Sequence, residues 1–308
     1  MNTKPYDDGQ YRQCTSVQLR IRSFREIQGA WDEMNKTLSD FAFSDMKRLL
    51  LIVGLAAALA SCGSSEITVM TYNIWGARGL YKAEDYDALA EVINSQQPDF
   101  CVLNEVHSRT HRSRRTLNHE ELAKRTGMDA SFAPAFYFNG GAYGNAILCK
   151  HPVKEKLHVY LPCDPSQDPK GGEVRSACFL KTEVGGFTFW MGGAHLDYRE
   201  DESSRIWQAN ILRDYIAKMD GHLFFAGDMN AEPDSKTMET FSEYMQLNYR
   251  DKEQKTWPSK HEADEPRVLI DYIMYRKPDK KIKLLSYDVI NNTASDHCAV
   301  VARFKVRR

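Results

Sequence analysis

The sequence predicts an α/β fold in which two mostly antiparallel β-sheets pack face to face with helices on the outside. Three observations lead to this class. From Glu66 onwards, short apolar runs rich in Val, Ile, Phe and Tyr alternate with amphipathic stretches. Many runs follow one another through short turns such as Gly185-Gly186, a hairpin signal. Helical spacing occurs at only a few connections, so we expect the helices to cover the sheets.

The apolar runs that we expect to form strands cover residues 67–72, 100–106, 130–137, 143–149, 153–161, 174–183, 187–196, 223–227, 268–275, 282–290 and 299–304. Helical spacing of apolar residues covers residues 83–96, 117–126, 202–218 and 235–245. Pro98 and Gly127 follow the first two of these segments and mark their ends. The 308 residues are enough for one large domain with additional segments.

Composition excludes some classes of protein but does not define a substrate. The formal net charge is -1 and 42% of the residues are hydrophobic. A strongly basic chain would indicate nucleic acid and a strongly acidic one disorder, and neither applies. The seven cysteines form no close C-x-x-C pair, which argues against a structural zinc site. Cys101, Cys149, Cys178 and Cys298 lie in apolar runs and are expected to be small buried hydrophobes, while any disulfide pairing stays open.

Residues 46–65 have the order of features found in an exported lipoprotein. Lys47 and Arg48 precede an apolar run, Leu49–Leu59, that has the length of a signal peptide and is short for a membrane span. The run ends in small residues and Cys62, which resembles the bacterial lipobox. We therefore expect residues 46–61 to be a lipoprotein signal peptide, Cys62 to be lipidated, and residues 62–65 to form a linker.

A signal peptide at Met46 leaves the preceding residues to be explained. Residues 1–45 are mixed and polar, and we interpret them as an over-extended start with little structure. The rival interpretation is a cytoplasmic extension before a signal anchor. Lipidation of Cys62 would hold the protein on a membrane of the bacterial cell envelope. The outer membrane is favoured because Gly63, and not Asp, follows the cysteine.

Polar residues of one kind lie at the ends of the expected strands. Each is an Asn, Asp, Glu or His that directly follows or interrupts an apolar run. They are Asn73, Glu105, His195, Asp197, Asp228, Asn230, Asp271, Asp296 and His297. Any single one could be a solvated turn residue, but so many endings of this kind are hard to explain in that way.

The spacing of these residues favours one shared site. Residues two apart on a strand face the same side, so His195 with Asp197, and Asp228 with Asn230, can each present a pair. Several carboxylates in one place repel one another unless a cation is present. Oxygen ligands without a cysteine cluster favour a hard cation, Mg²⁺ or Mn²⁺, over zinc.

Seven motifs carry a more specific resemblance. They are Thr71-Tyr-Asn-Ile-Trp, Leu103-Asn-Glu-Val, Gly144-Asn-Ala-Ile-Leu, Ala194-His-Leu-Asp, Gly227-Asp-Met-Asn, Ile270-Asp-Tyr-Ile and Ser295-Asp-His. In this order they resemble the motifs of the endonuclease/exonuclease/phosphatase superfamily, which includes deoxyribonuclease I, AP endonucleases, neutral sphingomyelinases and inositol-polyphosphate phosphatases. The third motif adds Asn145 to the candidate residues. The resemblance implies a four-layer α/β sandwich over residues 66–308, with the site at one end of the two sheets.

The resemblance also implies roles for the metal-binding and water-activating residues. Glu105 would be the principal metal ligand, with Asn73 and Asp296 completing or supporting that sphere. Asp228 would orient and deprotonate the attacking water, and Asn230 would fix the phosphate or Asp228 itself. One departure is Asn104, where a Gln before the metal-binding Glu is commoner.

The two histidines are implied to act on the phosphate. His297, polarised by Asp271, would donate to a phosphate oxygen, because an Asp–His pair keeps a proton on the ring. His195 would donate to the phosphate or the leaving group, with Asp197 close by on the same face. Cationic and neutral imidazoles stabilise the negative charge that develops during attack on a phosphoester.

Three functions compete at this point. The first is a phosphodiesterase or phosphatase acting on a lipid headgroup or small phosphoester, which membrane anchoring favours. The second is a nuclease, for which the basic loop His107–Arg115 could hold a phosphate-rich substrate, although a solvated loop explains it equally well. The third is a non-catalytic binding protein, against which the complete set of acids, amides and histidines argues. We expect a monomer.

Overall fold

The computed structural model describes residues 28–29, 31–33, 35–36, 63–79, 84–166, 172–249, 253–260 and 265–307. The chain divides into two units, Met1–Ala60 and Ser61–Arg308. In the first unit the described residues are helical and exposed. The proposed signal peptide, residues 46–61, and Cys62 lie outside the described residues. Within the described part of the chain, no helix combines the length and the apolar character that a membrane crossing requires.

The first sheet has six strands in the order β11-β12-β1-β2-β4-β3. They are β1 (Ser64–Asn73), β2 (Phe100–Ser108), β3 (Asp129–Phe138), β4 (Gly141–Cys149), β11 (Ile282–Ile290) and β12 (Ala299–Arg307). All neighbours are antiparallel except β1 and β2, which are parallel. The helix α2 (Tyr86–Gln96) forms the crossover between these two strands.

The second sheet repeats this plan with the order β5-β6-β7-β8-β10-β9. Its strands are β5 (Val153–Leu161), β6 (Arg175–Val184), β7 (Phe187–His195), β8 (His222–Asp228), β9 (Met245–Leu247) and β10 (Asp271–Arg276). Only β7 and β8 are parallel, and α4 (Ser203–Ile216) connects them. Gly185 and Gly186 form the β6–β7 turn with positive φ angles of 57° and 81°, which confirms the predicted hairpin.

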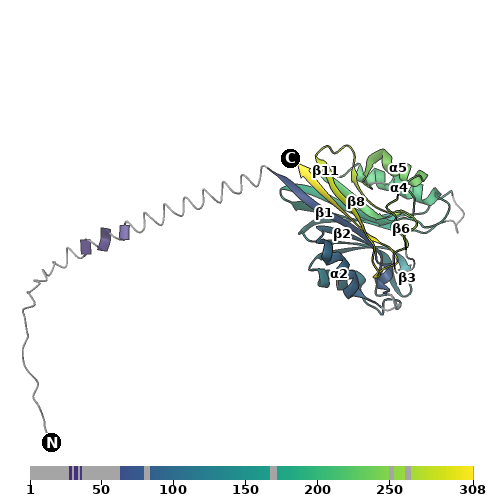
Figure 1. Ribbon diagram of the computed structural model, residues 1–308, viewed down its shortest axis with the longest axis horizontal. Coiled ribbons are helices and arrows are strands. Elements are labelled where there is room, and N and C mark those ends of the chain that lie inside the picture. Colours follow the sequence, from purple (N-terminus) through teal and green to yellow (C-terminus); the bar gives the residue numbers. More distant parts are fainter. Residues whose placement is uncertain are drawn as a thin grey trace, which may run out of the picture. The chain divides into compact units, whose positions relative to one another are not determined.

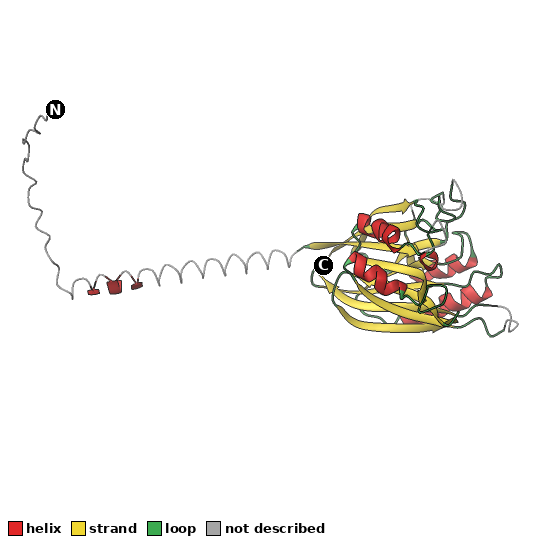
Figure 2. Cartoon of the chain, turned by 90° about the horizontal axis from the view of Figure 1, so that it is seen from below, coloured by secondary structure: helices red, strands yellow, loops and turns green. Residues whose placement is uncertain are grey.

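The two sheets pack face to face between layers of helices (Figures 1 and 2). Alternate residues of β1 show why both faces of a strand are apolar: Ile67 and Val69 belong to the core between the sheets, whereas Met70 and Tyr72 face α2. A third apolar core lies between the second sheet and the helices α4 and α5 (Lys236–Tyr244). The helix α3 (Asn118–Thr126) packs beside α2 and ends at Gly127, as predicted.

This arrangement confirms the four-layer α/β sandwich that the sequence predicted. The expected strands and helices are all present, with boundaries that differ by a few residues. The sequence did not predict the short strand β9 or the 3₁₀ turn Trp75–Ala77. Of the predicted buried cysteines, Cys101, Cys149, Cys178 and Cys298 are buried, and the described cysteines are free thiols.

Candidate active site

Strand ends from both sheets meet at one edge of the sandwich. Asn73 is the last residue of β1, His195 of β7 and Asp228 of β8. In the ladder, Asp228 pairs with His195 across the parallel strand and with Asp271 across the antiparallel strand β10. Three predicted residues are therefore neighbours because of strand register alone.

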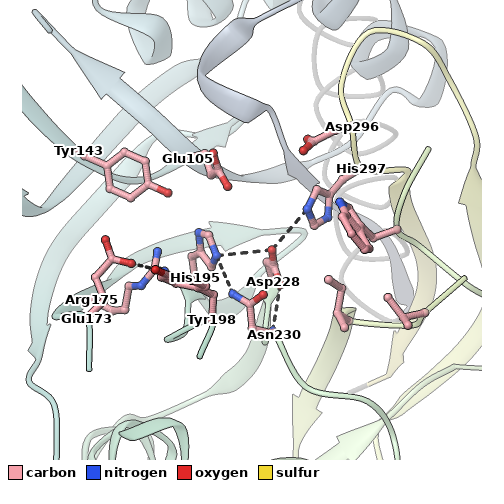
Figure 3. A pocket seen from close by; sticks show the side chains of 13 residues that line it. Glu105, Tyr143, Glu173, Arg175, His195, Tyr198, Asp228, Asn230, Asp296 and His297 are labelled. Carbon is pink, nitrogen blue, oxygen red and sulfur yellow. Dashed lines mark hydrogen bonds and ion pairs between the residues drawn. The ribbon is translucent and has the colours of Figure 1, made fainter. Parts of the chain in front are cut away.

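Glu105 reaches this edge through an irregularity in β2. The pairing of β2 with β4 shifts between Leu103 and Val106, and Glu105 has a positive φ of 57°. A residue other than glycine rarely adopts that conformation, and it costs about 1 kcal/mol or more. The distortion turns the Glu105 carboxylate toward the cavity that Figure 3 shows, where it lies half-buried.

Asn104 joins the two sheets directly beneath the site. Its Nδ2 donates to Asn145 Oδ1 at 2.8 Å and to the carbonyl of Ala194 at 3.0 Å. Its Oδ1 accepts from the backbone N–H of Asp228 at 3.0 Å. Asn145 in turn donates to the carbonyl of Ser176 at 2.8 Å. The residue that departs from the usual family pattern thus satisfies its amide fully, and Asn145 supports it from behind without lining the cavity.

The amide of Asn73 points its nitrogen into the cluster. Nδ2 lies 3.3 Å from Glu105 Oε1, 3.1 Å from Asp228 Oδ2 and 3.4 Å from His297 Nε2. Its Oδ1 accepts from the N–H of Trp75 at 3.1 Å, which fixes this orientation. Asn73 was expected either to bind the metal directly or to support the residues that bind it. The orientation of its amide fits the supporting role, because the oxygen that could bind a cation accepts from the backbone instead.

His297 lies between two carboxylates. Its Nδ1 is 3.0 Å from Asp271 Oδ2 and its Nε2 is 3.7 Å from Asp228 Oδ2. Burial lowers the pKa of His297, but the charge of Asp271 and its hydrogen bond outweigh burial and raise the pKa well above its ordinary value. His297 is therefore held as an imidazolium, with Nε2 directed toward Asp228 and the cavity (Figure 3).

His195, unlike His297, is a neutral imidazole. Burial, followed by the nearby charges of Arg175 and His297, lowers its pKa well below the ordinary value, so the ring is neutral. Asn230 Nδ2 lies 2.8 Å from its Nε2 and also donates to the carbonyl of Leu196 at 3.0 Å. Nε2 then accepts from the amide and the proton resides on Nδ1. His195 must gain a proton before it can donate through Nε2.

Asp228 is the point where these contacts meet. Its Oδ2 lies 3.5 Å from His195 Nε2, and its Oδ1 accepts from the backbone N–H of Asn230 at 2.9 Å. Burial and the charge of Asp271 raise its pKa, while His297 and the amide donors act in the opposite direction. A carboxyl with a raised pKa accepts a proton more readily than an exposed aspartate does.

The structure does not bring Asp197 into the cluster. The strand β7 ends at His195, so Asp197 lies beyond the regular strand from which the spacing argument was made, and it does not line the cavity. Asp197 is fully buried behind the cavity, where its Oδ1 accepts from the N–H of Glu173 at 3.3 Å and its own N–H donates to Gln208 at 3.1 Å.

The cluster opens into a cavity of about 470 Å³ that also contains residues missing from the sequence prediction. On the predicted side it is lined by Glu105, His195, Asp228, Asn230, Asp296 and His297. The additional lining residues are Tyr143, Glu173, Arg175, Tyr198, Trp257, Val268 and Ile270. They share no residue type and no regular spacing in the sequence, so no local pattern marks them.

The donor set fits a hard divalent cation. Glu105, Asp228, Asp271 and Asp296 bring four carboxylates together, and among the described lining residues only His297 and Arg175 oppose them with positive charge. The ligand atoms of Asp228, Asp271 and His297 lie within 4.8 Å of one another. Asp271 and His297 are already hydrogen-bonded to each other, however. Glu105 and Asp296 are therefore the better ligands for a cation.

The chain belongs to the endonuclease/exonuclease/phosphatase family, whose model matches residues 70–297. The 5'-tyrosyl-DNA phosphodiesterase of Caenorhabditis elegans is 26% identical over 220 residues, which cover 65% of this chain and 56% of that protein. The chain spans about half the length of the curated relatives that it matches.

Solved structures show the same fold. An endonuclease/exonuclease/phosphatase from Beutenbergia cavernae has a TM-score of 0.63 at 21% identity and covers 79% of this chain and 72% of that one. The mannosyl-6-phosphatase of Bacteroides thetaiotaomicron has a TM-score of 0.61 at 16% identity, with coverage of 77% and 99%.

Proposed function

We propose that the protein is a metal-dependent phosphoester hydrolase. One observation carries the proposal: Asp228 Oδ2 lies within 3.7 Å of two imidazoles that differ in charge, at the base of a cavity that also holds Glu105 and Asp296. A general base, a cationic donor and a carboxylate pair for a cation are the groups that phosphoester hydrolysis needs. Family membership and the activities of the related proteins support the same conclusion.

Each of these residues has a separate role in the proposed reaction. Asp228 takes the proton of the attacking water, since its pKa is raised and its Oδ2 faces the cavity. The Nε2–H of His297 donates to a phosphoryl oxygen, while Asp271 holds the ring in place. Asn230, fixed by Leu196, positions His195 and the phosphate. Glu105 and Asp296 would hold Mg²⁺ or Mn²⁺, which when bound supplies positive charge to the developing oxyanion.

A panel of esters tests this function. The purified enzyme is assayed with bis-p-nitrophenyl phosphate, sphingomyelin, phosphoinositides, single-stranded DNA and RNA, each with Mg²⁺, with Mn²⁺ and with EDTA. We expect release from at least one phosphoester that needs a divalent cation and stops with EDTA. Binding without release from every ester would instead favour a non-catalytic binding protein and contradict the proposal.

A nuclease is the second candidate, because one surface segment favours it. Arg109, Arg112, Arg114 and Arg115 are exposed on the loop that follows β2, close in sequence to Glu105. The loop is held in place, since the N–H of His111 donates to the carbonyl of Asn139 at 2.8 Å. Several exposed guanidinium groups on one loop suit a phosphate backbone. Hydrolysis of DNA or RNA that falls steeply with added salt would support this candidate.

The lipid anchor is also a proposal. The order of charge, apolar run and Cys62 supports a lipoprotein of the bacterial envelope, with the outer membrane preferred, and we propose a monomer. Mass analysis of the protein isolated from its own membranes tests the anchor. We expect acylated Cys62 at the mature N-terminus and a Cys62→Ser variant that no longer fractionates with membranes. Any other mature N-terminus would contradict it.

A further inference from the structure

The guanidinium of Arg175 is a buried cation whose hydrogen-bonding capacity is largely unused. Arg175 begins β6, lines the cavity and is only 3% exposed. Its Nη2 donates to Glu173 Oε2 at 2.8 Å. Its Nε and Nη1 make no hydrogen bond within 3.5 Å to the residues that the structure describes, although the Tyr143 hydroxyl lies near enough to interact with the guanidinium. An arginine cannot lose its charge, so these donors carry a desolvation cost until an acceptor reaches them.

The surroundings of Arg175 place it beside the catalytic groups and not among them. Figure 3 shows Arg175 with Tyr143 and Glu173 on one side of His195, whereas Asp228 and His297 lie on the other side. The ring of Tyr198 lies 6.0 Å from the guanidinium carbon and is 62% exposed, so it can move aside. Near His297 the cavity lining is more apolar. The Trp257 ring is tilted by 50° to the His297 ring with centroids 6.4 Å apart, and Val268 and Ile270 also line the cavity.

We propose that Arg175 binds a second phosphate of the substrate, adjacent to the phosphoester that is hydrolysed. The proposal rests on the proposed phosphoester hydrolysis and narrows its substrate class to esters that carry a further phosphate group. A phosphate supplies several acceptors to the fork of N–H groups, which a single carboxylate leaves partly unused. In the free enzyme the guanidinium donates to the Glu173 carboxylate, and the second phosphate replaces this carboxylate as the acceptor.

A set of nitrophenyl esters isolates the charge beside the reacting phosphorus. Thymidine 5'-(p-nitrophenyl phosphate) carries one phosphate, and the same ester with a 3'-phosphate differs from it only by a second one. In p-nitrophenylphosphorylcholine the neighbouring group is a cation. All three release p-nitrophenol, so kcat/KM can be compared directly. We expect the 3'-phosphorylated ester to be preferred over its parent by about tenfold to a hundredfold.

Substitutions assign this preference to Arg175. In Arg175→Gln the ratio of kcat/KM between the two thymidine esters should fall to near one, mainly through a higher KM for the 3'-phosphorylated ester. Arg175→Lys should keep part of the ratio because it keeps the charge. Arg303→Gln removes an arginine that is 40% exposed and outside the cavity, and should leave the ratio unchanged. Hydrolysis of the parent ester shows that each variant is folded.

The outcomes separate the two proposals. No hydrolysis of any ester by the wild-type enzyme would overturn the phosphoester function itself. Hydrolysis of the parent ester without a preference for the second phosphate would overturn only the role of Arg175. A preference for the choline ester would also overturn it, because Glu173 and not Arg175 would then select the substrate. A preference that survives in Arg175→Gln would show that another group binds the second phosphate.

Discussion

Asp228 takes its properties from neighbours that are distant in sequence. His195 precedes it by 33 residues, and Asp271, which also raises its pKa, follows on another strand. Asn73 reaches its Oδ2 from the opposite sheet, across 155 residues of chain. Each contact alone is common in proteins, but together they hold one carboxylate where it can accept a proton next to a fixed imidazolium.

The first prediction concerns the residues that carry the chemistry. We expect Glu105→Gln, Asp228→Asn and His297→Ala each to lower kcat by about a hundredfold or more, because each removes a charge or a proton-transfer group used in the transition state. Steady-state kinetics on an ester that the wild type hydrolyses measures the loss, and circular dichroism checks the fold. Asp288→Asn, whose side chain is 43% exposed and outside the cavity, is the control. Near-normal turnover in two of the three variants would contradict the assignment.

The second prediction concerns a hydrogen-bonded Asp–His pair that stabilises the fold away from the site. Asp279 Oδ2 lies 2.6 Å from His222 Nδ1. Burial raises the pKa of Asp279, but the hydrogen bond and charge of His222 outweigh it, and the pKa is lowered from its ordinary value of 3.8. A carboxyl with a lowered pKa stabilises the protein fully above that ordinary value and progressively less as the pH falls through the lowered one.

Asp279→Asn should therefore lower the free energy of unfolding by on the order of 1 kcal/mol at pH 7. The difference from the wild type should shrink toward zero once the pH is below the lowered pKa of the carboxyl. Urea titrations at pH 7, 5 and 3 measure it. A difference that grows as the pH falls would have the wrong sign for this pair.

At the scale of the element, the ends of the strands do most to build the site. The strands β7 and β8 run parallel, so His195 and Asp228 reach the same edge, and β10 begins there because it runs in the opposite direction. Close approach of β8 to β7 is possible only because residue 227 is a glycine. A Cβ at Gly227 would lie 1.9 Å from the carbonyl oxygen of Ala194, and its φ is +143°.

The third prediction compares two glycines. Gly227→Ala should destabilise the protein by more than about 3 kcal/mol and lower activity, because backbone atoms must separate and Asp228 follows the shift. Gly127→Ala is the matched control: Gly127 also has a positive φ of +67°, but a Cβ there would meet nothing within 4 Å. It should cost only about 1 kcal/mol and leave kcat unchanged. Equal costs at the two positions would contradict the close approach.

At the scale of the whole molecule, both sheets contribute residues to one acidic cluster. Asn73, Glu105 and Asp296 come from the side of the first sheet, whereas Asp228 and Asp271 come from the second. The aromatic core that fixes the sheets together includes Phe224 and Phe304, with ring centroids 4.8 Å apart. A cation bound by Glu105 and Asp296 of the first sheet would offset their repulsion with the carboxylates of Asp228 and Asp271 of the second sheet, and would stabilise the folded protein in this way.

The fourth prediction follows from this linkage. A saturating divalent cation, at about 100 times its dissociation constant, should stabilise the folded protein by about 2.7 kcal/mol, which corresponds to a rise of roughly 5 °C or more in the melting temperature. Glu105→Gln should lose most of this rise, and Asp288→Asn should keep it. Thermal unfolding with Mg²⁺, with Mn²⁺ and with EDTA measures the effect without any substrate. An equal rise in Glu105→Gln would place the cation elsewhere, for example between Asp228 and Asp271.

Much of the fold was predictable because its signals are local. The apolar periodicity of β1 and the glycine pair between β6 and β7 act over a few residues, and both were predicted correctly. The order of strands within each sheet was not predictable, because it depends on contacts such as β12 with β1, which are far apart in the chain. The expectation that Asp197 shares a face with His195 stays a prediction, because the regular strand β7 ends at His195 and Asp197 does not line the cavity.

The sequence by itself determined the secondary structure, the family and the kind of chemistry, since apolar periodicity and the residue types Asn, Asp, Glu and His are readable one segment at a time. Only the tertiary structure decided that the Asn73 amide presents its nitrogen to the cluster, and that two donor atoms of Arg175 are buried beside it without a hydrogen bond to the described residues. These properties depend on side-chain orientation and on burial between segments far apart in the chain. Burial sets the free energy of a charge, and the whole fold creates it.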